Sequence, residues 1–127
     1  MPKNEEVSLS SLGIQMPYNM QAEQSVLGAA LMDETVLNRL ITDMEPEMFY
    51  SDQNRAVYET MRGLYTGSEA VDIVTLVNAL GSEGTFASAD DAKVYLTRIA
   101  ETVPSISNVD SYFKIVKEKY QARRLID

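Results

Sequence analysis

The chain has no cysteine and no histidine among its 127 residues, so it lacks the two residue types on which much metal and nucleophilic chemistry depends. Without thiolates and imidazoles it cannot form the usual structural zinc sites, haem ligation or cysteine–histidine nucleophile pairs. Disulfide scaffolds are excluded too, and with 45% hydrophobic residues a chain of this length can bury a core without them. The composition predicts a single soluble globular domain.

Phosphate-binding loops are also missing. No glycine is followed by lysine, which rules out the G-x-x-x-x-G-K-[ST] loop, and no G-x-G-x-x-G pattern occurs. Paired carboxylates do occur, but in the N-terminal tail or near expected helix starts, where capping and the helix dipole account for them. We therefore expect no catalytic, cofactor-binding or metal site in this chain. The pairs are Glu5-Glu6, Asp33-Glu34, Glu45 with Glu47, and Asp90-Asp91.

The net charge and the hydropathy of the chain limit which partners it can bind. Eleven basic residues against nineteen acidic ones give a net charge of -8, which repels a phosphate backbone unless the basic residues cluster. The N-terminus lacks a signal sequence, and no window approaches the roughly 20 apolar residues of a membrane span. A cytoplasmic protein without a membrane partner is expected.

Helical periodicity covers most of the chain after an expected flexible tail over residues 1–16. The segment 73–80 has a strand as its alternative, because several of its residues are β-branched. The predicted fold class is all-α, with a compact body of about four helices over 17–86 and a two-helix hairpin over 87–127. Helices are expected over 21–32, 33–41, 53–65, 73–80, 89–102 and 107–126.

The first of these helices is expected to lie at the centre of the domain. Asn19 is a suitable N-cap, and the residues after the first turn are apolar on all sides. Gly28 would let a neighbouring helix approach closely.

The last helix carries more apolar surface than one hairpin partner needs. One stripe consists of Val109, Tyr112, Phe113, Val116 and Tyr120, and a second stripe of Ile115, Ala122 and Ile126 lies beside it. The second stripe contacts either the body of the same domain or another subunit. The pattern leaves both interpretations open.

Basic residues gather on the same helix, five of the eleven lying in the last fourteen positions. A solvated helix face is one interpretation, and a strip that contacts phosphate or an acidic partner is the other. The candidate contact residues are Lys114, Lys117, Arg123 and Arg124. The helix runs almost to Asp127 without a glycine or proline, so we expect the natural chain to continue.

Residues 17–33, PYNMQAEQSVLGAALMD, resemble the opening signature of replicative DNA helicases of the DnaB family, Pro-x-x-x-x-Ala-Glu-Gln-x-x-Leu-Gly. The resemblance extends to Asp127. It departs from the family at Asn54, where a histidine is frequent, and at Asp90-Asp91, where the family has Gly-Gly. Further matching segments are Met48-Phe49-Tyr50, VDIVTL at 71–76, Val103-Pro104-Ser105 to Asn108, Tyr112, and IVKEK at 115–119.

The resemblance implies an all-helical N-terminal domain joined by a linker to a RecA-like ATPase motor. The motor is not in this segment, so the segment is expected to be no enzyme by itself, and ATP and Mg²⁺ belong to the motor. In the family these domains pair through their hairpins into a trimer of dimers, a collar on the hexameric ring. The collar receives the helicase-binding domain of primase and, in some members, a loader protein. DNA contacts are expected mainly in the motor.

Together these points predict a domain for self-association and primase docking in a helicase that unwinds duplex DNA with ATP. The alternatives are a free-standing helical adaptor and a nucleic-acid-binding module that uses the basic last helix. The expected self-association residues are Tyr95, Ile99, Tyr112, Ile115, Val116 and Lys119.

Overall fold

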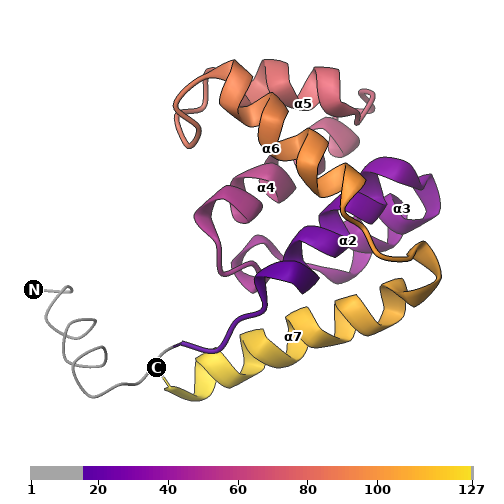
Figure 1. Cartoon of the computed structure of the whole chain (residues 1–127), viewed down its shortest axis with the longest axis vertical. Helices are drawn as coiled ribbons and strands as arrows, with labels where there is room; N and C mark the ends of the chain where they lie inside the picture. The colour runs from indigo at the N-terminus through magenta and orange to yellow at the C-terminus, as the bar shows by residue number, and fades with distance from the viewer. Residues whose placement is uncertain (1–15, 127) are drawn as a thin grey trace, which may run out of the picture.

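The computed structural model describes residues 16–126, in which all regular elements are helical (Figure 1). The predicted all-α fold is therefore confirmed, while the tail expected over 1–16 lies outside the described residues except for Met16. The elements are α2 (Met20–Met32), α3 (Glu34–Asp43), the 3₁₀ turn η1 (Pro46–Met48), α4 (Asp52–Thr66), α5 (Ile73–Leu80), α6 (Ala89–Glu101), the 3₁₀ turn η2 (Ile106–Asn108) and α7 (Val109–Ile126).

Side-chain caps fix where most of these helices begin, which is why the local sequence located them well. Asn19 accepts a hydrogen bond from the Ala22 amide at 2.9 Å, as expected for the N-cap of α2. The start of α5 is a reciprocal capping box: Asp72 accepts from the Thr75 amide, and the Thr75 hydroxyl accepts from the Asp72 amide. The segment 73–80 is thus a helix, and the alternative strand is ruled out.

Helix α2 is the centre of the domain, as predicted. It packs against α3, α4, α6 and α7, and Val26, Leu27 and Ala29 are fully buried. Figure 1 shows α6 on one side of α2 and α7 on the other. A Cβ placed on Gly28 would lie 2.2 Å from the carbonyl oxygen of Ile99, so this glycine does permit the close approach of α6.

The arrangement of α6 and α7 differs from the expected hairpin. The two helices follow each other in the chain, but each makes its main helix contact with α2 rather than with the other. Phe113 and Val116, expected to face the helix over 89–102, are buried in the common core that includes α2. The reason is that α2 is apolar on all sides and offers a second face, whereas α6 already buries Leu96 and Ile99.

None of the helices within residues 16–126 has the combination of length and apolarity needed to cross a membrane.

Two glycines of this fold should respond oppositely to alanine. Gly63 lies inside α4 with nothing within 4 Å of a Cβ, so Gly63→Ala should raise the free energy of unfolding by about 0.5–1 kcal/mol through helix propensity. Gly28→Ala should lower it by about 1–3 kcal/mol, because the new methyl group collides with the backbone of α6. Urea unfolding followed by far-UV circular dichroism measures both, and a neutral Gly28→Ala would contradict the close packing of α2 and α6.

Candidate interaction surfaces

Helix α7 contacts the rest of the domain through one face. Phe113 and Val116 are buried there, with 1% and 2% of their surface exposed. On the α3 side, the Arg39 guanidinium lies 4.3 Å from the centroid of the Phe113 ring and also pairs with Asp110. The body therefore covers this face and leaves the two flanks of α7 as candidate surfaces.

On one flank, five residues follow a heptad spacing of alternating three and four positions, which is typical of a helix–helix seam. Apart from Lys119 they are apolar or aromatic, and they are half-buried or exposed, Ile126 keeping 41% of its surface accessible. Tyr112 and Ile115 also line a small cavity of about 140 Å³ at the start of α2. We call this flank the seam: Tyr112, Ile115, Lys119, Ala122 and Ile126.

The structure brings together only some of the residues predicted for self-association. Tyr112, Ile115 and Lys119 share the seam. Ile99 and Val116, with 1% and 2% exposure, are packed inside the domain's own core, so neither presents a surface to a second copy in this structure. The sequence pattern could not separate the inner from the outer residues, because both stripes are apolar at helical spacing.

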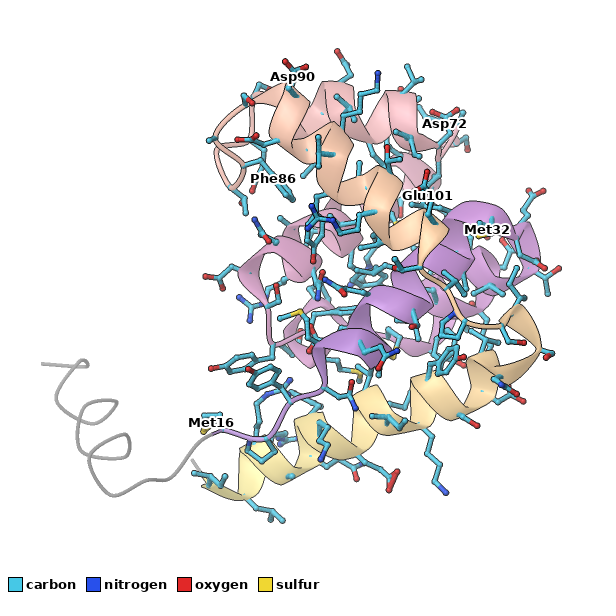
Figure 2. All side chains as sticks on the ribbon, in the orientation of Figure 1. Met16, Met32, Asp72, Phe86, Asp90 and Glu101 are labelled. Carbon is cyan, nitrogen blue, oxygen red and sulfur yellow. The ribbon has the colours of Figure 1, made fainter. Side chains whose placement is uncertain are left out.

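Tyr95, the remaining predicted residue, is held by contacts within the domain. Its hydroxyl donates to the Asn54 amide oxygen and accepts from Gln24 Nε2 at 3.2 Å. Its ring lies 5.5 Å from that of Phe86, which Figure 2 labels in the loop beside α6. Burial raises the pKa of the Tyr95 phenol, since the charged form would lose its hydration.

Tyr95 belongs to a buried polar network that sequence reasoning missed. Glu23 is 1% exposed, and its carboxylate accepts from the Tyr50 amide at 2.8 Å, the Ser51 amide at 3.3 Å and Asn54 Nδ2 at 3.0 Å. The network joins α2 to the start of α4 and, through Tyr95, to α6. Its signal in the sequence was only the acidic residue in the first turn of α2, which the helix dipole also explains.

The opposite flank of α7 carries the basic strip. Lys114, Lys117 and Arg124 lie there with Gln121, at spacings of three and four residues that place them on one side of the helix. None of these three cations has a carboxylate within ion-pair distance among residues 16–126. Three of the four residues predicted for contact with phosphate or an acidic partner thus share one side of α7, and Lys119 lies in the seam.

Arg123, the fourth predicted contact residue, is engaged by contacts within the domain. It is 7% exposed, and its guanidinium donates to the carbonyl oxygens of Pro17 and Met48, both at 3.0 Å. Burial lowers the pKa of Arg123, while the charge of Glu23 acts in the opposite direction. Arg123 fastens the end of α7 to the segment before α2.

Within residues 16–126 no group of three or more His, Cys, Asp or Glu side chains is placed to hold a metal ion. The cavities are shallow, none exceeding about 400 Å³ among the best defined.

Comparisons with known proteins agree with the fold. The family model described as the DnaB-like helicase N terminal domain matches residues 15–118. The chain is 36% identical over 110 residues to the replicative DNA helicase DnaC of Bacillus subtilis and 34% identical over 110 residues to the replicative DNA helicase DnaB of Geobacillus stearothermophilus. Each match covers 87% of this chain and 24% of the relative, so the chain spans about a quarter of these helicases.

A solved structure is similar as well. The crystal structure of the N-terminal domain of the DnaB helicase from Mycobacterium tuberculosis superposes with a TM-score of 0.79 at 34% sequence identity. The match covers 88% of this chain and 79% of that chain.

The Glu23 network should contribute strongly to stability. Glu23→Ala leaves two part-buried backbone amides and the buried Asn54 side chain without their acceptor, so the free energy of unfolding should fall by about 2–4 kcal/mol. Glu59→Ala is the matched control, because Glu59 is an exposed helical glutamate and its loss should change stability by less than about 0.5 kcal/mol. Equal effects of the two variants in urea unfolding would contradict the network.

Two tyrosines should make the fold sensitive to alkali. Burial raises the pKa of Tyr58 and of Tyr95, so the folded chain keeps these protons at a pH where the unfolded chain, with a tyrosine pKa of about 10, has lost them. The neutral phenols therefore make their full contribution to the free energy of unfolding below about pH 10, the unfolded pKa. This contribution is lost as the pH rises through the pKa of the folded state. Unfolding across this range should show a smaller alkaline loss for Tyr95→Phe than for the parent chain. An identical pH profile would contradict the shift.

Proposed function

The chain belongs to the family of DnaB-like helicase N-terminal domains, and on this basis we propose that it is the collar domain of a hexameric replicative DNA helicase. Its physical role is association with other proteins. ATP-driven unwinding, with ATP and Mg²⁺, belongs to the motor in the remaining three quarters of the relatives' length. Sequencing the gene beyond the codon for Asp127 tests this context. A G-x-x-x-x-G-K-[ST] loop after a predicted strand supports it, and a stop codon would favour a free-standing helical adaptor.

The observation that carries the proposal is the seam of α7. Its heptad spacing matches a second helix of the same kind, and its residues are left partly uncovered by the body. A surface that pairs with its own copy forms a two-fold dimer, and three such dimers complete a hexameric collar. Lys119 would set the register in the middle of the seam, as a polar residue at a core position of a coiled coil does.

Val116 and Ile99, which were predicted for self-association but are buried, would affect the proposed dimer only indirectly. Val116 anchors α7 to the core and so keeps the seam turned outward. Ile99 holds α6 against Gly28 of α2 and has no direct part in the seam.

Primase docking is the second part of the proposed role. Family membership supports it, and the acceptor is the helicase-binding domain of primase, with a loader protein in some members. Isothermal titration of the cognate primase domain into this chain tests it, with saturable binding expected. No heat change at any accessible concentration would limit the function to self-association.

The seam predicts the effect of a charge on association. Ile115→Asp should leave the helix content unchanged and abolish self-association in sedimentation velocity, since a buried carboxylate without a partner opposes pairing. Ile126→Asp should act in the same direction with less effect on folding, because Ile126 is 41% exposed in the single chain.

Gln121→Asp is the matched control for these variants. It adds the same charge to the same helix on the opposite flank, where a seam dimer has no contact. Association that survives Ile115→Asp and Ile126→Asp, or that is lost equally in Gln121→Asp, would show that the interface lies elsewhere.

A further inference from the structure

Aromatic rings and arginines alternate from the end of α7 to the segment before α2. The Arg124 guanidinium lies 5.8 Å from the Tyr120 ring centroid, and Arg123 lies 5.7 Å from Tyr120 and 5.4 Å from Tyr50. Tyr50 in turn stacks on Tyr18, with centroids 4.6 Å apart and planes 11° apart. Separations of this size are those of favourable cation–π and stacking contacts. We call this set the ladder.

The outer end of the ladder is accessible. Tyr18 and Tyr50 keep 44% and 39% of their surface exposed although their rings are in contact. The segment before α2 reaches the C-terminal end of α7 in Figure 1, and Figure 2 shows Met16 beside that end. An exposed ring thus ends a series of contacts that starts at Arg124 of the basic strip.

Three of the five basic residues on α3, α4 and α6 have a carboxylate partner, and Lys93 and Arg98 on α6 have none among the described residues. Arg39, Arg55 and Arg62 each pair with at least one carboxylate within 3.5 Å. Lys114, Lys117 and Arg124 have no such partner among the described residues, although the chain has eight more acidic than basic residues. Three cations without an ion-pair partner in the described part of the chain lie on one side of one helix, about 15 Å from first to last at 1.5 Å per residue, and favour an extended anion.

The exposed aromatic rings beside these cations decide which class of extended anion fits the surface. An acidic protein surface would match the cations but gains little from an exposed stacked tyrosine pair. Single-stranded nucleic acid uses both features, because its phosphates follow a basic groove and its unpaired bases stack on aromatic side chains. Duplex DNA offers no unstacked base to the ladder.

We propose that the basic strip and the outer ring of Tyr18 form a site for single-stranded nucleic acid, with phosphates along Lys114, Lys117 and Arg124 and a base on Tyr18. Arg123 and Tyr50 position the ladder and do not contact the ligand. The strip and the seam lie on opposite flanks of α7. This proposal does not depend on self-association.

The test is fluorescence anisotropy of a labelled oligothymidylate of about 15 nucleotides, within the site sizes known for single-strand binding. The 127-residue chain should bind at low salt, with log K falling against log salt by about 0.7 per phosphate contact. Tyr18→Ala should weaken binding at least about fivefold, the lower limit for one lost base stack. Because the chain has no tryptophan, tyrosine emission can be followed, and the part of its quenching that is lost in Tyr18→Ala reports stacking on this one of the seven tyrosines.

Matched variants distinguish binding at this site from non-specific electrostatic attraction between the oligonucleotide and the chain. Tyr65→Ala removes a tyrosine of similar exposure, 39% against 44% for Tyr18, outside the ladder and should leave affinity unchanged. Lys117→Gln should reduce the salt slope by about 0.7, whereas Lys119→Gln, the same change on the opposite flank, should not. Circular dichroism checks folding, and Tyr18→Leu replaces Tyr18→Ala if the smaller residue unfolds the chain.

Three results would overturn the proposal. If the chain does not bind the oligothymidylate at low salt, the proposed site does not exist. Equal losses in Lys117→Gln and Lys119→Gln would mean non-specific attraction to the helix. If polyglutamate competes as well as the oligonucleotide and Tyr18→Ala has no effect, the strip binds an acidic protein instead.

Discussion

The burial of α2 on all sides is the constraint on which the rest of the structure depends. Four helices pack against it, and three consecutive small residues, Gly28, Ala29 and Ala30, leave room for close neighbours. Gly28 admits the backbone of α6, and Ala29 and Ala30 keep the surrounding core narrow. A central helix with larger side chains would hold its neighbours further away, and α6 and α7 could not then pack on both sides of it.

A fully surrounded helix must also satisfy its polar residues from within the protein. Glu23 does so by accepting from the start of α4, and Tyr95 extends the same network to α6. The Ala-Glu-Gln part of the family signature therefore supports the architecture of this domain, because Ala22 lies in the core and Gln24 donates to Tyr95. Tyr95 is consequently engaged inside the domain, which limits what it can offer to a partner.

The helices were predictable because local signals define them. Asn19 and Asp72 mark helix starts within three residues of the amides that they cap, and the apolar periodicity follows at once. The partner of each helix was not predictable, since nothing local distinguishes packing of Phe113 on α2 from packing on α6. The same limit applies to Arg123, whose acceptor Pro17 lies 106 residues away in the chain, and to the contacts of Glu23 with residues about 27 positions later.

Helix α7 shows how one element can serve several contacts. Its inner face belongs to the core, and its two flanks differ in chemistry: one is apolar with a central lysine, and the other carries cations without partners. Arg123 holds the last turn against Pro17 and Met48, so both flanks keep a fixed direction relative to the body. A helix free at this end would let the seam and the basic strip rotate away from their positions. The buried arginine is therefore the contact that allows proposed dimer pairing and proposed nucleic-acid binding to use opposite sides of one helix.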